Sequence, residues 1–457
     1  MSDDFKTTQS FPVFRALGAP RRTMLDRLLS IFADVRAGEG LGAVLLGLNG
    51  FLILTAYYLL KSVRDALILA EAGAEVRAYA AAGQAAVLLL VIPLYSRFAS
   101  HVNRLKLIEW VTLFFVSHLA LFYVFGKAGM RVGVVYYIWL GVFNMLIVAQ
   151  FWGFANDLYT ESQGKRLFPL VGIGVSIGGV AGAFIARSLF RPMGPYAIML
   201  VAAALFILTL VFTRIVHRRE SATAAAKKRG DAAQPIGGKS GFQLVFSQRY
   251  LLLIAALVVL LNVVNTTGEY LLGRLVEQES LRAFGAAAAA AAERKVFIGQ
   301  FMASIFGWVN LFSMLMQMFL VSRIFLYIGV RGALFIPPVI ALGSYGLVAT
   351  APVLSLVRGI KILENSVDYS LSNTTRHALF LPTSREAKFK AKAAIDSFFV
   401  RIGDMLQAGI VFAGNALALS VTGFAVVNLT LTLAWLGIVY MIYREHKSRT
   451  AEVAVAA

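Results

Sequence analysis

The sequence predicts an all-helical integral membrane protein with twelve transmembrane helices in two six-helix halves. The chain of 457 residues is 59% hydrophobic and only 15% charged, whereas soluble proteins carry about 25% charged residues. Continuously apolar segments recur along the chain, and about 20 such residues cross a bilayer. These segments do not alternate as barrel strands do. A basic stretch rich in Ala, Gly and Ser, 216–247, divides them into two sets.

The order of the segments gives the domain organisation. We expect an N-terminal segment at 1–42 without a cleavable leader, an N-terminal half at 43–215, a linker at 216–247, a C-terminal half at 248–443 and a tail at 444–457. The predicted spans are 43–69, 78–97, 106–126, 132–156, 167–191, 195–215, 248–272, 297–322, 329–350, 352–373, 390–418 and 423–443.

The basic residues indicate the orientation. They gather in alternate turns, as at Arg104, Lys165 and Arg331, and in the tail. Positive charge marks the cytoplasmic side of a membrane protein. We therefore expect a multi-pass protein of the bacterial inner (plasma) membrane with both termini in the cytoplasm. Because the net charge of +19 falls between spans, it predicts a lipid bilayer as partner and no nucleic acid.

Several chemistries are excluded or disfavoured. The chain has no cysteine, which excludes disulfides and thiolate zinc sites. Its five histidines lack ligand spacing, and there is no Walker motif or serine triad. We expect no metal, no cofactor and no enzymatic activity. A monomer is expected, since each half covers the inner face of the other.

A short internal repeat supports two related halves. Ser-Arg followed by a further Arg leaves the second span in YSRFASHVNR (95–104), and the same pattern leaves the eighth in VSRIFLYIGVR (321–331). With twelve spans and a central linker, this predicts the major facilitator fold. Transporters of that fold bind substrate near the midplane, between halves that rock against each other.

Charged residues inside the spans form stripes on four helices. Charge within a bilayer costs roughly 2.5–3.5 kcal/mol per residue, so its placement is informative. The stripes comprise Lys61, Arg64 and Asp65; Asn262, Asn265 and Glu269; Arg358, Lys361, Glu364 and Asp368; and Lys392, Asp396, Arg401 and Asp404. One interpretation is pairing within each helix or contact with headgroups. The other is a polar cavity, which we prefer for Arg64, Lys361 and Lys392.

The glycine-rich stretch GIGVSIGGVAGA, 172–183, resembles a phosphate loop only superficially. No Lys-Ser or Lys-Thr follows it, and it continues as a membrane span. Small residues four apart let two helices approach closely. The stretch therefore predicts helix packing.

Three segments resemble one family. FWGFANDLYTESQGKRLFPLVGIG (151–174), YYLLKSVRDALIL (57–69) and FLPTSREAKFKAKAAID (380–396) are similar, in order and spacing, to motifs of the ATP/ADP translocase family of plastids and intracellular bacterial parasites. The chain resembles a divergent member from a free-living bacterium. The resemblance implies exchange of nucleotides across a membrane.

The resemblance also assigns site residues. Two family lysines correspond to Arg64 and Lys392, whereas two family glutamates correspond to Leu140 and Asn265. We expect an alternating-access transporter (antiporter) of an organic anion, possibly a nucleotide or phosphorylated metabolite. Its substrate residues would be Arg64, Lys392, Asn262, Asn265, Glu269 and Lys361, and its gating or proton-coupling residues Lys61, Asp65, Asn156, Asp157, Arg358, Glu364, Asp368 and Asp396.

Two alternatives remain. Aromatic residues make up 12% of the chain, which would suit a proton-coupled exporter or flippase of an amphiphile. A non-transporting sensor or assembly factor would keep the fold without needing the charged stripes.

Overall fold

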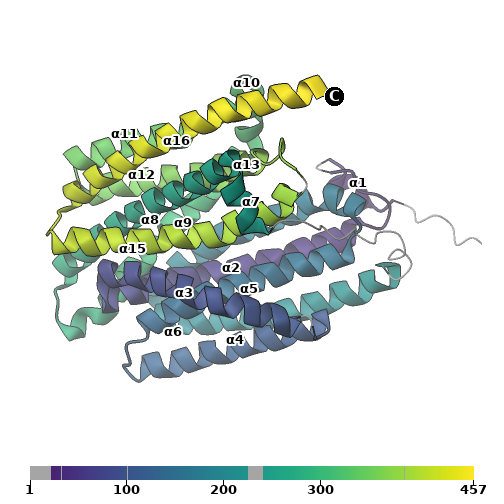
Figure 1. The fold of residues 1–457 in the computed structure, drawn as a ribbon. Helices are drawn as coiled ribbons and strands as arrows, with labels where there is room; N and C mark the ends of the chain where they lie inside the picture. The colour runs from purple at the N-terminus through teal and green to yellow at the C-terminus, as the bar shows by residue number, and fades with distance from the viewer. Residues whose placement is uncertain (1–21, 32, 100, 225–239, 385, 457) are drawn as a thin grey trace, which may run out of the picture.

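The structure, a computed structural model, describes residues 22–31, 33–99, 101–224, 240–384 and 386–456. Every regular element within these ranges is a helix, as the sequence predicts (Figure 1). Residues 1–21 and 225–239, which belong to the predicted N-terminal segment and linker, lie outside the described residues.

The two halves follow one another along the chain. The first contains α1 (Met24–Leu29), α2 (Gly40–Glu71), α3 (Gly73–Ala99), α4 (Arg104–Lys127), α5 (Gly133–Leu158) and α6 (Glu161–Ala224). The second contains α7 (Gly241–Ser247), α8 (Arg249–Phe284), η1 (Ala288–Ala290), α9 (Ala291–Phe319), α10 (Val321–Ala333), α11 (Ile336–Thr350), α12 (Leu354–Val367), η2 (Asp368–Ser372), α13 (Asn373–Ala378), η3 (Ala387–Ala391), α14 (Lys392–Ala394), η4 (Ile395–Phe399), α15 (Val400–Ala416) and α16 (Val421–Ala456). Both ends of the predicted linker are therefore helical.

The number of membrane helices depends on how bent helices are counted. Among the described residues, nine helices are long and apolar enough to cross a membrane, or ten if α10 and α11, bent by 76°, form one span. The element α6 holds two of the predicted spans. They are joined at Gly194, whose φ of 71° breaks the helix. A π-helix, η2, interrupts another predicted span after α12. The predicted spans fall mostly on helical residues, but the count of twelve membrane helices stays a prediction.

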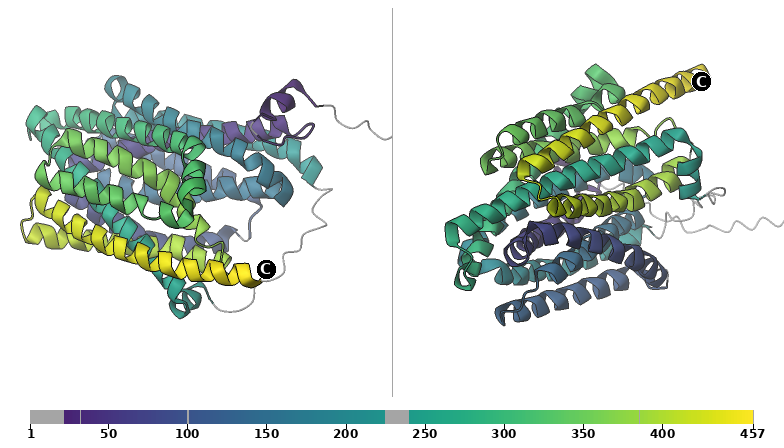
Figure 2. Two further views of the ribbon diagram at one scale, coloured as in Figure 1. Left: turned by 90° about the horizontal axis from the view of Figure 1, so that it is seen from above. Right: turned by 60° about the vertical axis from the view of Figure 1, so that its left-hand side comes forward.

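The bundle has two ends. The helix α1 and the C-terminal end of α16 lie at the same end (Figures 1 and 2), together with α7, which follows the linker. We call this end the linker side. The opposite end, at which α2 joins α3, is the distal side. The purple-to-blue helices of the N-terminal half lie below the green-to-yellow helices of the C-terminal half in Figure 1.

Glycines of α6 bring its first half against α2. A Cβ atom added at Gly174, Gly178 or Gly182 would lie 2.3–2.5 Å from a backbone oxygen of α2. Such contact is shorter than any side chain tolerates, so these positions require glycine. The predicted packing role of the stretch 172–183 is confirmed.

The halves meet through a few helices. Helix α9 packs against α2 and α6, and α3 packs against α8 and α15. Tyr58 donates a hydrogen bond across this interface to the Oδ1 atom of Asn310 at 2.8 Å, and Asn310 donates to the Gly179 carbonyl at 3.1 Å. The interface between the halves is therefore formed mainly by α2, α3 and α6 on one side and α8, α9 and α15 on the other.

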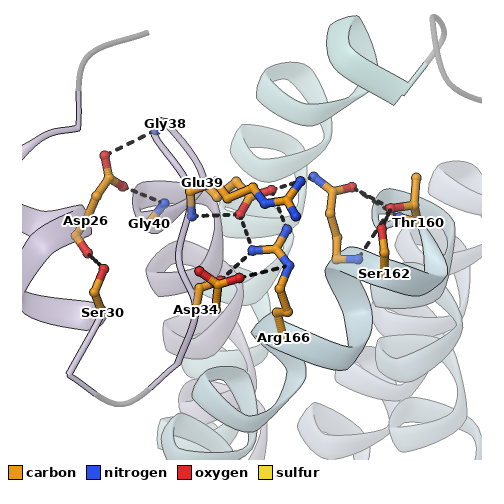
Figure 3. A network of polar contacts seen from close by, with 11 residues as sticks. Asp26, Ser30, Asp34, Gly38, Glu39, Gly40, Thr160, Ser162 and Arg166 are labelled. Atoms are coloured by element: carbon orange, nitrogen blue, oxygen red, sulfur yellow. Dashed lines mark hydrogen bonds and ion pairs between the residues drawn. The ribbon is translucent and has the colours of Figure 1, made fainter.

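On the linker side, α1 is held to α2 and α6 by a polar network (Figure 3). The Asp26 carboxylate accepts hydrogen bonds from the N–H groups of Gly38 and Gly40 at 3.1 and 2.9 Å. Glu39 accepts two from Arg166 at 2.9 and 3.0 Å and one from Gln163 at 3.0 Å. Arg166 thus anchors the segment before α2.

The ionisation of Glu39 makes this anchor sensitive to acid. Burial raises the pKa of Glu39, but hydrogen bonds from Arg166, Gln163 and the Arg36 backbone outweigh it and lower the pKa from 4.5 to about 2. A carboxylate with a lowered pKa stabilises the folded form above the unfolded value, and this stabilisation is lost as the pH falls from about 4.5 towards 2.

We expect Glu39→Gln to weaken docking of α1 at neutral pH by up to about 3 kcal/mol, at about 1.36 kcal/mol per pKa unit. Hydrogen exchange of the Gly38 and Gly40 amides, corrected for intrinsic rates, measures this docking. Protection should fall with acidification in the native chain and be low at every pH in the variant. Glu445→Gln, in a pair with Arg249 at 3.3 Å, is the control. Equal protection at neutral pH in the native and Glu39→Gln chains would contradict the prediction.

Candidate functional site

A chain of ion pairs crosses between the halves towards the distal side. Arg64 and Asp65, adjacent on α2, pair at 3.0 Å. Asp65, which is fully buried, also lies 3.4 Å from Arg77 of α3. Arg77 in turn pairs with Glu269 of α8 at 2.9 Å. Three residues predicted for the site thus meet through Arg77, which the sequence analysis did not select.

Lys61 lies in an aromatic enclosure between the halves. Its Nζ atom is 4.3 Å from the ring centre of Phe306 on α9, 5.2 Å from that of Tyr58 and 6.0 Å from that of Tyr369 on η2. Within the described part of the chain, no carboxylate pairs with Lys61. One turn further along α2, the Arg64 guanidinium lies 4.6 Å from the Tyr137 ring centre. A lysine held only by rings keeps its charge available for an anion.

Lys361 lies inside the C-terminal half and is fully engaged there. It is 1% exposed, donates to the side-chain and backbone oxygens of Asn265 at 2.6 and 3.1 Å, and pairs with Glu364 at 3.0 Å. Asn262 donates to Asp404 at 2.8 Å and to the Val400 carbonyl. These contacts join helices of one half, so Lys361 and Asn262 have a structural role in this conformation.

Lys392 lies far from Arg64. It pairs with Asp396 at 2.7 Å near the linker side. Along α14, η4 and α15, twelve residues separate Lys392 from Asp404, which contacts Asn262. Along α8, seven more separate Asn262 from Glu269. At 1.5 Å per residue this is about 28 Å. The structure therefore does not bring Arg64 and Lys392 together around one anion. The two residues lie at different depths along the helix axes, although both were predicted to face the same cavity.

The remaining predicted residues are spread over both sides. Arg358 donates to Ser304 of α9 at 2.9 Å and lies over the Phe301 ring. Asp157 pairs with Arg104 at 3.3 Å on the linker side. Asn156 lines a linker-side cavity of about 730 Å³ together with Lys165. The groups predicted to gate are thus not one cluster.

The distal side is closed by contacts that the sequence analysis missed. Glu71, at the end of α2, pairs with Lys295 of α9 at 2.6 Å and accepts a hydrogen bond from the Gly133 N–H at 2.7 Å. Lys295 also donates to Tyr196 at 2.9 Å. Glu277 of α8 accepts from the Ala74 N–H at 2.8 Å. These residues, which we call the distal gate, tie the two halves together.

The position of the distal gate explains why it was missed. Glu71, Ala74 and Lys295 lie at the ends of membrane spans. Charged residues are expected there because span ends face water, so Glu71 and Lys295 did not stand out. Charges of opposite sign at the distal ends of α2 and α9, which belong to different halves, were the available signal. The cross-half polar contacts described above all lie in the middle or distal part of the helices. The structure is therefore the conformation closed on the distal side.

Comparisons with known proteins agree with this architecture. The profile described as TLC ATP/ADP transporter matches residues 133–446. ADP,ATP carrier protein 1 of Chlamydia muridarum is 24% identical over 339 residues, covering 64% of this chain and 61% of that carrier. This chain thus spans less than two thirds of that relative. ADP,ATP carrier protein 5 of Rickettsia bellii is 22% identical over 471 residues, covering 87% of this chain and 92% of that carrier.

A solved structure shares the fold. The nucleoside transporter NupG superposes with a TM-score of 0.58 at 14% identity, covering 90% of this chain and 99% of that one. At this identity the likeness concerns the fold, and it confirms the predicted major facilitator architecture.

Proposed function

Because this chain belongs to the TLC ATP/ADP transporter family, we propose that it exchanges a nucleotide, with ATP and ADP as the first candidates, by alternating access across a membrane. The relatives named above are carriers, which favours transport over catalysis, lipid export or sensing. Basic turns on the linker side support a cytoplasmic assignment of that side, and hence a bacterial inner membrane protein with both termini inside. We keep the monomer as part of the proposal.

The single observation that carries the proposal is the aromatic enclosure of Lys61. An unpaired ammonium group offers charge-assisted hydrogen bonds to a phosphate. The rings of Tyr58, Phe306 and Tyr369 offer stacking surfaces for a base, and stacking of this kind contributes about 1–3 kcal/mol per base. Because α2 belongs to one half and α9 and η2 to the other, a bound nucleotide would contact both halves.

Arg64 supplies a second cation in the proposed site. It is now paired with Asp65, but the same guanidinium could turn one edge to a phosphate while the other stays on Asp65. Asp65 would then lose one of its two contacts with Arg64 and could bind Arg77 more closely, which alters the ion pair that links α3 to Glu269. Binding energy drives a transition only through contacts that differ between states, and this exchange of partners supplies such a difference.

Counter-exchange in proteoliposomes tests the proposed function. Vesicles loaded with ADP should take up labelled ATP about tenfold faster than empty vesicles, because exchange requires an internal substrate. Thermal stability should also rise with ATP, by about 2.7 kcal/mol at a hundredfold excess over Kd. Uptake that ignores internal ADP, together with an unchanged thermal transition, would contradict nucleotide exchange.

A further inference from the structure

A small cavity, lined mostly by apolar side chains with a few polar groups among them, lies inside the C-terminal half, behind the proposed site. It has a volume of about 30 Å³ and is walled by α8, α11, α12, η2 and α16. Four of its lining residues place buried polar atoms there without a hydrogen-bond partner among the described residues: Glu364 Oε1, Asp368 Oδ1, Ser372 Oγ and Trp435 Nε1. Ser372 and Trp435 are only 4% and 5% exposed.

Unpartnered polar atoms at this depth point to an occupant. A buried polar group without a hydrogen-bond partner is costly, and a packed apolar wall would have avoided that cost. A cavity needs about 10–15 Å³ of this kind of volume to hold one water molecule. The space is therefore sufficient for about two water molecules, which could bridge the two carboxylates, the hydroxyl and the indole N–H.

The two carboxylates differ in their partners. Glu364 accepts from Lys361 and from the Tyr345 hydroxyl, both at 3.0 Å, so its negative charge is compensated. Within the described residues, Asp368 has neither an ion-pair partner nor a side-chain hydrogen bond. The charged groups acting on Asp368 are Arg376, Lys361, Glu269 and Glu364. The other cavity walls, on α11 and α16, contribute no charged side chain.

We propose that Asp368 is a proton-binding site that couples proton movement to substrate binding at Lys61. The inference rests on the proposed transport function. Asp368 takes one proton from water on one side of the membrane and returns it to water on the other. Bound water in the cavity relays this proton, and no covalent bond to substrate forms. With the proton bound, Lys361 and Glu364 form a compensated pair beside a neutral acid.

The π-helix η2 provides the link between the two places. Asp368 lines the cavity, whereas the next residue, Tyr369, lies over Lys61. Adjacent residues of a helix point in different directions, so η2 faces the cavity and the substrate position at once. π-Helical turns are rare and are frequently found at functional sites. A change in charge at Asp368 therefore acts on the segment that carries one wall of the Lys61 enclosure.

The test compares Asp368→Asn, which mimics the protonated acid, with Glu279→Gln, an exposed carboxylate paired with Arg282 at 3.1 Å. Labelled ATP accumulation is measured in proteoliposomes with and without a gradient of one pH unit. One coupled proton predicts a tenfold change in the steady-state ratio in the native chain and in Glu279→Gln, since one unit equals about 1.36 kcal/mol. Asp368→Asn should show a ratio independent of the gradient while exchange of ATP for ADP continues.

An infrared measurement separates this proposal from the proposed function. The purified native chain without substrate should show a carboxylic acid C=O band that titrates with pH and is missing in Asp368→Asn. Loss of this band supports the protonation site even if no nucleotide is transported. An unchanged band, an unchanged pH response in Asp368→Asn, or stimulation by a sodium gradient at constant pH would overturn it. Trp435→Phe, which removes the indole N–H donor and leaves a smaller aromatic ring, should shift the titration and provides a second variant in case Asp368→Asn misfolds.

Discussion

Lys61→Met is expected to lower kcat/KM for nucleotide transport by about a hundredfold. A hydrogen bond to a charged group contributes about 1.5–3 kcal/mol, and 3 kcal/mol corresponds to a factor of about 150. Methionine keeps the length of the side chain and its contact with Phe306 and Tyr58, so the charge is the main loss. The measurement is initial uptake of labelled ATP into vesicles loaded with ADP.

Stability provides an independent readout for this variant. Lys61 has no acidic partner among the described residues, so its burial costs desolvation energy that no ion pair returns. The free energy of unfolding should therefore stay constant or rise in Lys61→Met. Lys127→Met, at the exposed end of α4, is the matched control and should transport normally. Native transport by Lys61→Met would show that the enclosure is not the anion site.

The helical architecture followed from the sequence because its causes are local. Apolar length and positive turns place each span, and the glycines at 174, 178 and 182 indicated close packing before the partner helix was known. The break of α6 at Gly194 lies between the predicted spans 167–191 and 195–215. The π-turn η2, by contrast, interrupts the predicted span 352–373 without leaving a trace in the apolar pattern.

The site was predicted only in part, since periodicity gives the face of a helix and not its depth relative to another helix. Lys61, Arg64, Asp65 and Glu269 were selected by their stripes and do lie near the interface between halves. Lys392 shares a suitable face but lies about 28 Å away by helical rise. Arg77 lies just before the predicted span 78–97 and was not selected. Its partner Glu269 is 192 residues further on, beyond the reach of a local pattern.

Lys295→Met is expected to open the distal side. Removing one partner of a buried pair costs about 3–5 kcal/mol, and this cost falls only on the conformation in which Glu71 and Lys295 meet. Their side chains are 7% and 15% exposed, so solvent replaces little of the lost interaction. A loss of 3 kcal/mol shifts the ratio of closed to open conformations by roughly a hundredfold.

Cysteine labelling can measure that shift, because the native chain contains no cysteine. Ala74 is 3% exposed at the interface with α8. Cysteine introduced there should react slowly with a bulky maleimide in the native background and tens of times faster with Lys295→Met, in purified protein. Arg282→Met is the control, since its exposed pair with Glu279 is worth at most about 1 kcal/mol. Equal labelling rates in all three backgrounds would mean that Arg77–Glu269 and Glu277–Ala74 hold the distal gate without Lys295. The Glu71–Lys295 ion pair would then affect only the rate at which the distal side opens. The buried chain of ion pairs from Arg64 to Glu269 would set the equilibrium between the closed and open conformations.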